Sequence, residues 1–478
     1  MKCFNQVAAV LLTTSMLSSA TPASAHNHTD STSPHSPKSN ENEGTPITPT
    51  SAIQTAELFL QKHLGPQAKH YRLLVQDRMT VPEIVTGDAD KLTANSPLTY
   101  AYPIRFERLI NGIPLDHSTI TVWVGQTGEI LRYEDHSQIH DPSAFPIPSR
   151  AITMTEAKKA FTKHLELYPY YRKQQLFTSI QSGERPKTAP VLKYEVETAV
   201  INALTGEKIW LEPASRHTQY PDTIVPLKKT GTDLLIYSQA DAAALIQQQF
   251  GIHPDQMQHS VQLGIHPASG LPEDTYQWVD EPTGRTITMT IDHARRHITS
   301  LILPEPLATH TPGKRITSEA AQRAAISYLE GFLNTNETMK ITQVFLSSRD
   351  SLIPGWVDQG KLAMESPIRF DGDQYVIVFS RLHDGIPVQD DSFGVSVDAA
   401  TGAFRSYYAF SPAATDSLPA VPAKLSVDQA RKAYLDQLSL ELRYVWPRFH
   451  GQFAPQPYLV YVPKNKFSFI DATTGKMI

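Results

Sequence analysis

Two histidines four residues apart, His293 and His297, have the spacing that most resembles a metal-binding or catalytic pair. Zinc peptidases place two such histidines on one helix, with a glutamate between them as the general base. Here the intervening residues are Ala294, Arg295 and Arg296, so the glutamate is missing. We expect the two histidines in a hairpin, where positions i and i+4 share a face but lie far apart. The pair therefore predicts no metal site.

Two acidic pairs, Asp390-Asp391 and Asp371-Gly372-Asp373, supply carboxylates of the kind used in acid–base chemistry or calcium binding. We interpret the first as a solvated bend after Pro387 and the second as a hairpin turn. The second pair also lacks the glycine and the distal glutamate of an EF-hand loop. No H-E-x-x-H, G-x-S-x-G, P-loop or G-x-G-x-x-G motif occurs. The sequence thus predicts a protein that is not an enzyme, with no catalytic residue, cofactor-binding residue or metal ligand.

The N-terminus has the pattern of a signal peptide over residues 1–25. Lys2 is a short basic region, Val7 to Leu17 is apolar, and Ala23-Ser24-Ala25 is a small-residue cleavage site. Cleavage would remove Cys3, the one cysteine of the 478-residue chain. We therefore expect a thiol-free mature protein that is secreted or held on the outer side of the cell envelope.

The predicted mature chain begins with His26-Asn27-His28. A free amine, two amides and an imidazole at the third position can form a square-planar nitrogen set for Cu(II) or Ni(II). The alternative is an incidental histidine in a polar spacer. Residues 26–50 contain one aliphatic residue, Ile47, and cannot bury enough apolar surface to fold. We expect them to form a disordered polar linker.

The composition of the whole chain excludes several classes of protein. There are 43 lysines and arginines against 48 aspartates and glutamates, so the net charge is −5 and no basic field favours nucleic acid. Hydrophobic residues make up 40%, which is enough to build cores. No later stretch approaches the roughly 20 apolar residues of a transmembrane helix.

Five stretches have the start signal and apolar stripe of an amphipathic helix. Four of them have a hydroxyl followed three residues later by an acceptor, the spacing of a capping box. The four pairs are Ser51 and Gln54, Thr153 and Glu156, Ser238 and Asp241, and Ser426 and Gln429. The fifth stretch begins at Thr317 and lacks the acceptor, because Ala320 stands there.

Strand-like segments follow each helix and end in a common turn, [DN]-x-x-T-G. The turn occurs at Asn202–Gly206, Asp398–Gly402 and Asp471–Gly475, and we assign Asp280–Gly284 to the same class. An Asp or Asn side chain can bond the backbone two residues on, and glycine accepts the positive φ that closes the turn. The pattern therefore predicts a structural turn and not a phosphate-binding loop.

A larger duplication underlies these repeats. The segment from Phe106 to Pro114 resembles the segment from Phe379 to Pro387, and both contain a strong hairpin signal, Asn-Gly or Asp-Gly. We predict two repeat pairs, at 51–212 and 316–478, with a smaller unit at 233–303 between them. Each module is expected to be α+β, with one helix packed on a small antiparallel sheet.

Aromatic residues cluster at comparable places in the two repeats, at Tyr168-Pro169-Tyr170-Tyr171 and Tyr444-Val445-Trp446-Pro447. Exposed aromatics beside prolines can stack on sugars or peptides. The alternative, which we favour, is loop aromatics folded back over the sheet to close a small core.

The helix, the antiparallel strands and the V-D-x-x-T-G turn resemble PepSY-like domains. With the N-G-I-P hairpin, the chain is similar to the YcdB/YcdC-type repeated domain of Gram-positive bacteria, which is related to thermolysin-type propeptides. The resemblance implies an exported array of tandem α+β modules. In thermolysin-like zymogens such modules chaperone and inhibit the attached peptidase. Because this sequence ends at Ile478, directly after its last turn, we expect no attached catalytic domain.

These observations predict a secreted non-enzymatic binding protein whose partner is an extracellular protein or peptide. It could modulate, inhibit or chaperone a secreted peptidase. Addition of an extended segment to an exposed strand edge would be a physical route to such binding. Three alternatives stay open: a structural protein of the cell wall, an enzyme whose site is not visible as a sequence motif, and a metal-handling protein, which would need the His26 amine to be free.

Overall fold

The structure of the chain is a computed structural model. It describes residues 46–74, 83–85, 99–137, 141–173, 190–197, 199–211, 218–229, 234–265, 272–304, 315–365, 372–410, 424–464 and 469–477. The predicted signal peptide, His26-Asn27-His28 and most of the predicted linker lie outside these ranges. The chain divides into two compact units, which we describe separately. Unit 1 comprises Met1–Phe161, Val200–Ile209 and Leu440–Lys464, and unit 2 comprises Thr162–Ala199, Trp210–Ser439 and Asn465–Ile478.

Unit 1 is built on one mixed sheet. Its helices are α2 (Pro49–Leu64) and α3 (Met154–Lys163). Its strands are β1 (Tyr71–Leu73), β2 (Glu83–Val85), β3 (Thr99–Ile110), β4 (Ile113–Gly125), β5 (Ile130–Asp135), β8 (Val200–Asn202), β9 (Lys208–Ile209), β20 (Leu440–Val445) and β23 (Tyr458–Pro463). The order is β1-β3-β4-β20-β23-β8-β9, with β2 beside β3 and β5 beside β4. A small hairpin, β21 (Arg448–Phe449) with β22 (Gln452–Phe453), stands apart from this sheet. Helix α2 packs Ala52, Ala56 and Leu60 onto β3 and β4.

Unit 2 contains the rest of the second repeat and the middle module. Its strands outside the middle module are β6 (Glu166–Lys173), β7 (Pro190–Glu197), β10 (Thr218–Gln219), β11 (Thr223–Pro226), β16 (Thr338–Ser347), β17 (Gln374–His383), β18 (Ile386–Asp398), β19 (Phe404–Phe410) and β24 (Phe469–Asp471). Its main helices are α5 (Gln239–Phe250), α6 (Ser318–Leu333) and α9 (Val427–Gln437), with two short ones, α7 (Arg349–Leu352) and α8 (Gln359–Glu365). No helix in the described part of the chain is long and apolar enough to cross a membrane.

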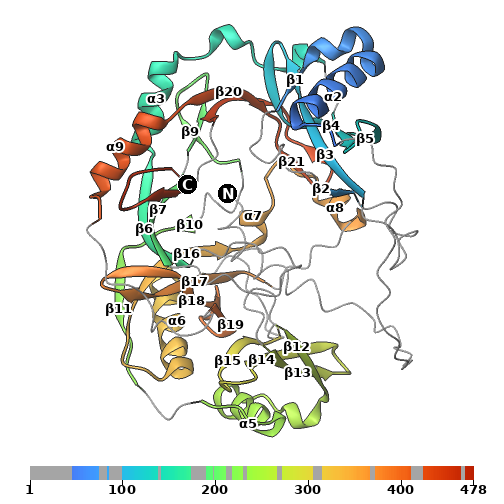
Figure 1. Cartoon of the computed structure of the whole chain (residues 1–478). Coiled ribbons are helices and arrows are strands. Elements are labelled where there is room, and N and C mark those ends of the chain that lie inside the picture. Colours follow the sequence, from blue (N-terminus) through green and yellow to red (C-terminus); the bar gives the residue numbers. More distant parts are fainter. Residues whose placement is uncertain are drawn as a thin grey trace, which may run out of the picture. The chain divides into compact units, whose positions relative to one another are not determined.

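The middle module spans residues 234–304 and consists of α5 and four antiparallel strands. These are β12 (Gln258–Ile265), β13 (Pro272–Asp280), β14 (Arg285–Asp292) and β15 (Ile298–Ile302). Helix α5 covers one face of this sheet (Figure 1). Strand β15 pairs with β19, so the module extends the sheet of the second repeat in the order β16-β17-β18-β19-β15-β14-β13-β12. The module therefore ends on β12.

A hairpin of each predicted repeat lies in a different unit from the helix and hairpin that begin that repeat. Strands β6 and β7 come from the first repeat but lie in unit 2, where β7 pairs with β24 and β6 runs parallel to β18. Strands β20 and β23 come from the second repeat but lie in unit 1, where β23 pairs with β8 and β20 runs parallel to β4. Red strand β20 therefore belongs to the sheet of the blue strands (Figure 1). Each unit is completed by a segment of the other repeat.

The predicted turns anchor the helices. In four modules the residue before the helix cap donates its backbone N–H to the turn that follows the strands. The pairs are Ile47 to Gln126 (2.7 Å), Ile152 to Ala203 (2.7 Å), Ile316 to Ala399 (2.8 Å) and Leu425 to Ala472 (2.8 Å). The carbonyl of the same residue accepts the hydroxyl of a strand tyrosine, from Tyr102, Tyr461, Tyr375 and Tyr194 respectively. This clamp explains why turn and helix signals recur together in the sequence.

The predicted helix caps are confirmed except at the first helix. Thr153 and Glu156 bond reciprocally, as do Ser426 and Gln429. Thr317 accepts from the N–H of Ala320, as expected for a cap without the reciprocal acceptor. The first helix is capped by Thr48 and not by Ser51, because Pro49 fits its first turn and leaves Ser51 to donate to the threonine hydroxyl.

The assignment of Asp280–Gly284 to the common turn is wrong. That segment is the hairpin tip between β13 and β14, the counterpart of the Asn-Gly and Asp-Gly tips. The true counterpart is Asp292–Arg296, in which Oδ1 of Asp292 accepts the N–H groups of Ala294 and Arg295 at 2.9 and 2.8 Å. Arg296 takes the place of the glycine at a φ of 64°, which hides the turn from a sequence pattern.

Candidate binding site on the middle module

Strand β12 is an open edge. It pairs with β13 over its whole length, from Gln258 opposite Val279 to Ile265 opposite Pro272. Within the described ranges, no strand pairs with its other side. All eight of its residues are exposed. Its outward N–H and C=O groups, about four of each kind in alternation, are available to another strand.

The sequence of β12 contains none of the residues that commonly prevent an edge strand from pairing with another strand. Its sequence, QHSVQLGI, contains no proline and no lysine, arginine, aspartate or glutamate. Natural edge strands commonly carry charges, proline or bulges that prevent pairing. Instead, Val261, Leu263 and Ile265 are 49%, 79% and 71% exposed. A long, neutral edge with three exposed aliphatic side chains is typical of a surface that another strand covers.

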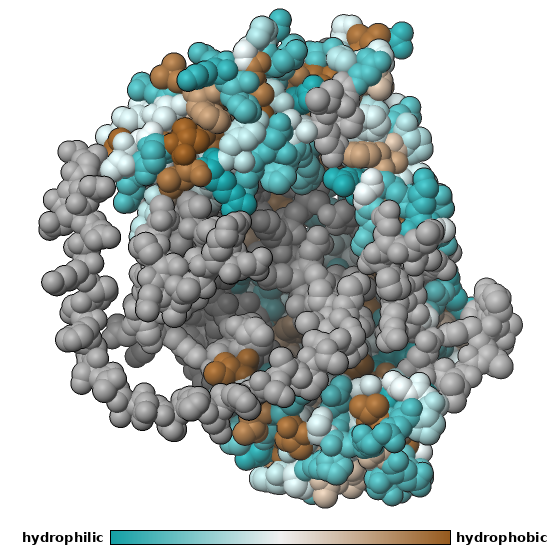
Figure 2. Space-filling view, turned by 90° about the vertical axis from the view of Figure 1, so that its right-hand side faces the viewer, coloured by the Kyte–Doolittle hydropathy of each residue, from teal (hydrophilic) through white to brown (hydrophobic). Residues whose placement is uncertain are grey.

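These three side chains lie on the same face of the sheet as the core. Directly opposite residues of an antiparallel pair point to one face. Val261 stands opposite Tyr276, and His259 stands opposite Trp278. Tyr276 and Trp278 are buried in the hydrophobic core with Leu245 of α5. The apolar row of β12 therefore continues the core-facing side of the sheet beyond the helix, and Figure 2 shows hydrophobic residues on the surface of this module.

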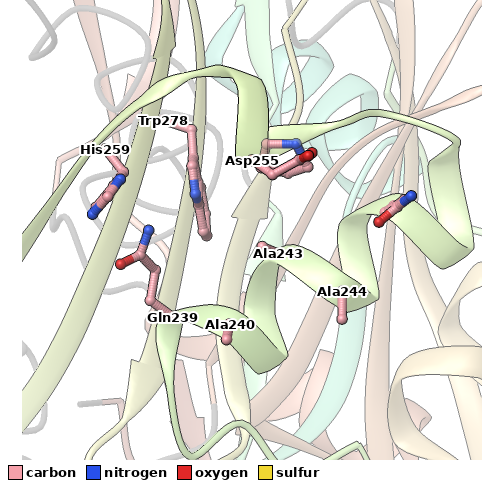
Figure 3. Close-up of a pocket in the computed structure, with 9 residues that line it drawn as sticks. Gln239, Ala240, Ala243, Ala244, Asp255, His259 and Trp278 are labelled. Atoms are coloured by element: carbon pink, nitrogen blue, oxygen red, sulfur yellow. The ribbon is translucent and has the colours of Figure 1, made fainter.

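A pocket of about 470 Å³ lies between the start of α5 and the His259 end of β12. Figure 3 shows Ala240, Ala243 and Ala244 along the helix wall, with Trp278 and His259 on the strands. The row of alanines arises because positions i, i+3 and i+4 share a helix face, and their small size leaves the space open. Gln239, Gln247 and Asp255 supply the polar part of the lining. The pocket can take a side chain of a strand laid against β12.

A buried acid anchors the inner end of this site. Asp274, opposite Leu263, is 5% exposed and occupies the position of the clamp tyrosine of the other modules. His293 contacts it through Nδ1, at 2.9 Å from Oδ1, and Arg296 lies 3.0 Å from Oδ2. The three residues together replace the tyrosine and glycine of the other four modules and the alanine that three of them carry. They keep the turn attached to the sheet through charged hydrogen bonds instead of a phenol.

The residues that the sequence singled out for chemistry do not meet in one site. His293 is held by Asp274, and His297 lies beyond the same turn, which confirms the hairpin interpretation. The described residues contain no group of three or more His, Cys, Asp or Glu side chains placed to hold a metal ion.

The interpretation of Asp390-Asp391 as a solvated bend is wrong, since both lie within β18. Asp391 is 4% exposed and pairs with Arg381 at 3.1 Å, so the charge is neutralised inside the sheet. Asp371 lies outside the described residues. Asp373 directly precedes β17 instead of lying in a hairpin turn, and it pairs with Arg315 at 2.6 Å.

Most residues of the aromatic clusters lie in strands, and Trp446 and Pro447 lie in the connection between β20 and β21. Tyr168 to Tyr171 lie in β6, and Tyr444 and Val445 end β20. Tyr171 and Tyr444 have no exposed surface, and each is the residue at which its strand pairs with a parallel strand. Neither cluster is an exposed stacking platform.

Among the described residues of unit 2, Glu195 on β7, opposite Tyr168, is a carboxyl group with a strongly raised pKa. Burial raises its pKa to about 8; Arg172 acts against this rise and Glu197 adds to it. A carboxyl with this pKa is largely protonated at neutral pH, which lowers the cost of burying it in the hairpin of β6 and β7.

Residues 29–136 match the family model described as the YcdB, YcdC repeated domain. This part of the chain resembles a YcdB/YcdC-type repeat. The predicted resemblance is thereby confirmed, and the match includes α2 and the β3–β4 hairpin that carried it. The expected α+β class with antiparallel pairing is confirmed as well.

No curated protein matches the chain. Among solved structures, the Bacillus megaterium YpeB C-terminal domain is similar at 12% identity, with a TM-score of 0.30, over 51% of this chain and 96% of that one.

The sequence did not single out β12. Its alternation of Val261, Leu263 and Ile265 is the ordinary signal of a half-buried strand. Whether such a strand ends a sheet depends on topology, and no local pattern records it.

Proposed function

We propose that the protein is a non-enzymatic binding protein that receives an extended segment of another polypeptide along β12. The observation that carries the proposal is the eight-residue open edge without charge or proline, beside a pocket on the same face. Strand addition gives affinity through main-chain hydrogen bonds and specificity through pockets for alternate side chains. The bound segment would be neutral and would alternate apolar with polar residues, because its apolar side chains would cover Val261, Leu263 and Ile265.

The partner class that we propose is a secreted polypeptide, with an extracellular peptidase as the first candidate. Residues 1–25 have the pattern of a signal peptide, which supports export. The resemblance to propeptide-like modules supports a role as modulator, inhibitor or chaperone of a peptidase. Capture of partners from culture medium tests this role.

The test compares three forms of the 26–478 protein immobilised for capture from culture medium: the unmodified chain, Leu263→Lys and Leu131→Lys. Leu263→Lys adds a charge to β12, whereas Leu131→Lys adds one to β5, which is already charged. Leu263 is 79% and Leu131 38% exposed, so neither change removes a core contact.

We expect partners that the unmodified chain and Leu131→Lys retain and that Leu263→Lys loses by tenfold or more. Peptidases in that set would then be assayed for slower cleavage in the presence of the protein. The proposal is wrong if the three forms retain the same proteins, or if the unmodified chain retains none.

A further inference from the structure

The sequence of β12 matches the partner that its own edge requires: it is neutral and alternates apolar with polar residues. In an antiparallel pairing of two copies centred on Gln262, Val261 of one copy stands opposite Leu263 of the other. On the same face, His259 stands opposite Ile265 of the other copy. On the opposite face, Gln262 stands opposite itself and Ser260 opposite Gly264. Every residue from 259 to 265 then has a partner of the same face.

The face of the sheet selects this type of register. A shift by one residue would place the apolar row of one copy on the face opposite to the row of the other. Val261, Leu263 and Ile265 of both copies would then remain in water. In a register centred on a residue of β12, six aliphatic side chains gather on one face, flanked by the two α5 helices, and cover one another. A centre at Leu263 would pair only residues 261–265, and a centre at Val261 would pair residues 258–264 and leave Ile265 without a partner. A centre at Gln262 pairs residues 259–265 and so includes all three aliphatic side chains.

The charge pattern permits the same arrangement. A two-fold axis brings each charge near its own copy, so a charged edge repels itself unless opposite signs alternate in register. β12 carries no charged side chain, and Asp255 is the one acid in the lining of the pocket. No like charges therefore meet along the edge.

We propose that a second copy of this chain covers β12, through antiparallel β12–β12 pairing centred on Gln262, and that the two sheets become continuous. The inference shares with the proposed function the premise that β12 is open to strand addition. It names the resting occupant, which a partner segment displaces. The dimer is isologous, because the same surface contributes on both sides.

The test uses cysteine cross-linking, for which the chain is well suited because Cys3 is its one cysteine. In the Cys3→Ser background, Gln262→Cys places two sulfur-bearing residues directly opposite each other. Opposed residues of an antiparallel pair have Cα atoms about 4.5–5.5 Å apart, which lies within the disulfide range. Ser260→Cys is the matched control, since it is equally exposed on β12 but faces Gly264 of the other copy.

We expect a covalent dimer from Gln262→Cys under mild oxidation, at least tenfold faster than from Ser260→Cys. Sedimentation of the unmodified chain should show a concentration-dependent dimer, which Leu263→Lys shifts to monomer. Equal cross-linking rates for the two variants, or a monomer at all concentrations up to about 100 µM, would overturn the inference.

The dimer and the proposed function can fail independently. A monomeric protein that still captures β12-dependent partners supports the proposed function and overturns the dimer. Rapid cross-linking of Gln262→Cys with no captured partner supports the dimer and overturns the proposed function. Cross-linking that a captured partner suppresses supports both.

Discussion

Strands β5 and β19 occupy the same place in their modules, directly after the turn that anchors the helix. They differ in whether another strand pairs with their outer side. In unit 1, β5 has β4 on one side and no strand on the other within the described residues. It carries Arg132, Glu134 and Asp135, and the first two form an ion pair at 2.7 Å. In unit 2, β15 covers β19, whose one charged residue, Arg405, is paired inside the sheet with Asp398.

The difference shows how one module is used in two ways. Where the sheet ends, the strand is charged, and where the sheet continues, the exposed charges are absent. Strand β12 ends the sheet of unit 2 but has the composition of a strand that continues. We infer from this mismatch that β12 is an edge that binds another strand, whereas the charges of β5 prevent such pairing.

The largest expected effect comes from removing Trp278, the core residue that stands opposite His259 of β12. Trp278→Ala removes a side chain that is 1% exposed beneath α5 and opens a cavity next to His259. We expect the free energy of unfolding of unit 2 to fall by about 3–5 kcal/mol. Denaturant unfolding measures it, with Trp210→Ala, 39% exposed, as the control that should cost clearly less. If both variants lost the same free energy of unfolding, Trp278 would not be the core residue that stabilises this sheet.

The turns of the two units should respond differently to a fall in pH. In unit 2, burial acts to raise the pKa of both Asp398 and Asp471. Hydrogen bonds from Thr401, together with the charge of Arg405, outweigh burial at Asp398. Hydrogen bonds from Thr473 and Thr474 outweigh it at Asp471. Their folded pKa values are therefore lowered below the usual value of about 4. The stabilisation is present above that value and is lost as the pH falls through the folded pKa.

The corresponding turn of unit 1 has Asn202, which accepts the N–H of Leu204 at 2.8 Å and does not titrate. Hydrogen exchange at decreasing pH, corrected for intrinsic rates, should show protection lost at Ala400 and Thr401 before Leu204. The Asp398→Asn variant should remove the acid sensitivity of its own turn. Simultaneous loss at all three amides would show that the turns do not respond separately.

The smallest expected effect comes from removing the charges of β5. Arg132→Thr with Glu134→Thr gives a neutral edge that keeps good strand-forming residues. Because this ion pair is partly exposed, stability should change by less than about 1 kcal/mol. Self-association in sedimentation should increase, since the charges no longer oppose pairing. If the variant self-associates no more than the unmodified chain, the charges of β5 are not what prevents another strand from pairing with it.

Local chemistry was readable from the sequence, and long-range pairing was not. Thr153 with Glu156 and Ser426 with Gln429 are caps set by residues three apart, and the structure confirms them. The turns at Asp398 and Asp471 likewise depend on their own backbone. The partner of β7 is a strand about 270 residues further on, however, and no pattern within either repeat indicates the exchange.

The same limit applies to the candidate site. Arg296 hides a common turn because an arginine stands where the pattern requires glycine. Asp391 was assigned to a bend because its counter-ion, Arg381, lies on the neighbouring strand. The open edge of β12 follows from its position at the end of the sheet. For Asp391 and for β12, the missing information was the position of the neighbouring strands.

The exchange of hairpins also constrains the order in which the molecule can be made. Unit 1 contains the first residues of the fold and also β23, which ends at Pro463. A growing chain can therefore form α2 with β3 and β4 early, but its sheet lacks β20 and β23 until the second repeat has been synthesised. Domains that fold as units usually close in sequence from the N-terminus. Here unit 1 begins first, but β20 and β23 are made only after unit 2 has been synthesised as far as Ser439.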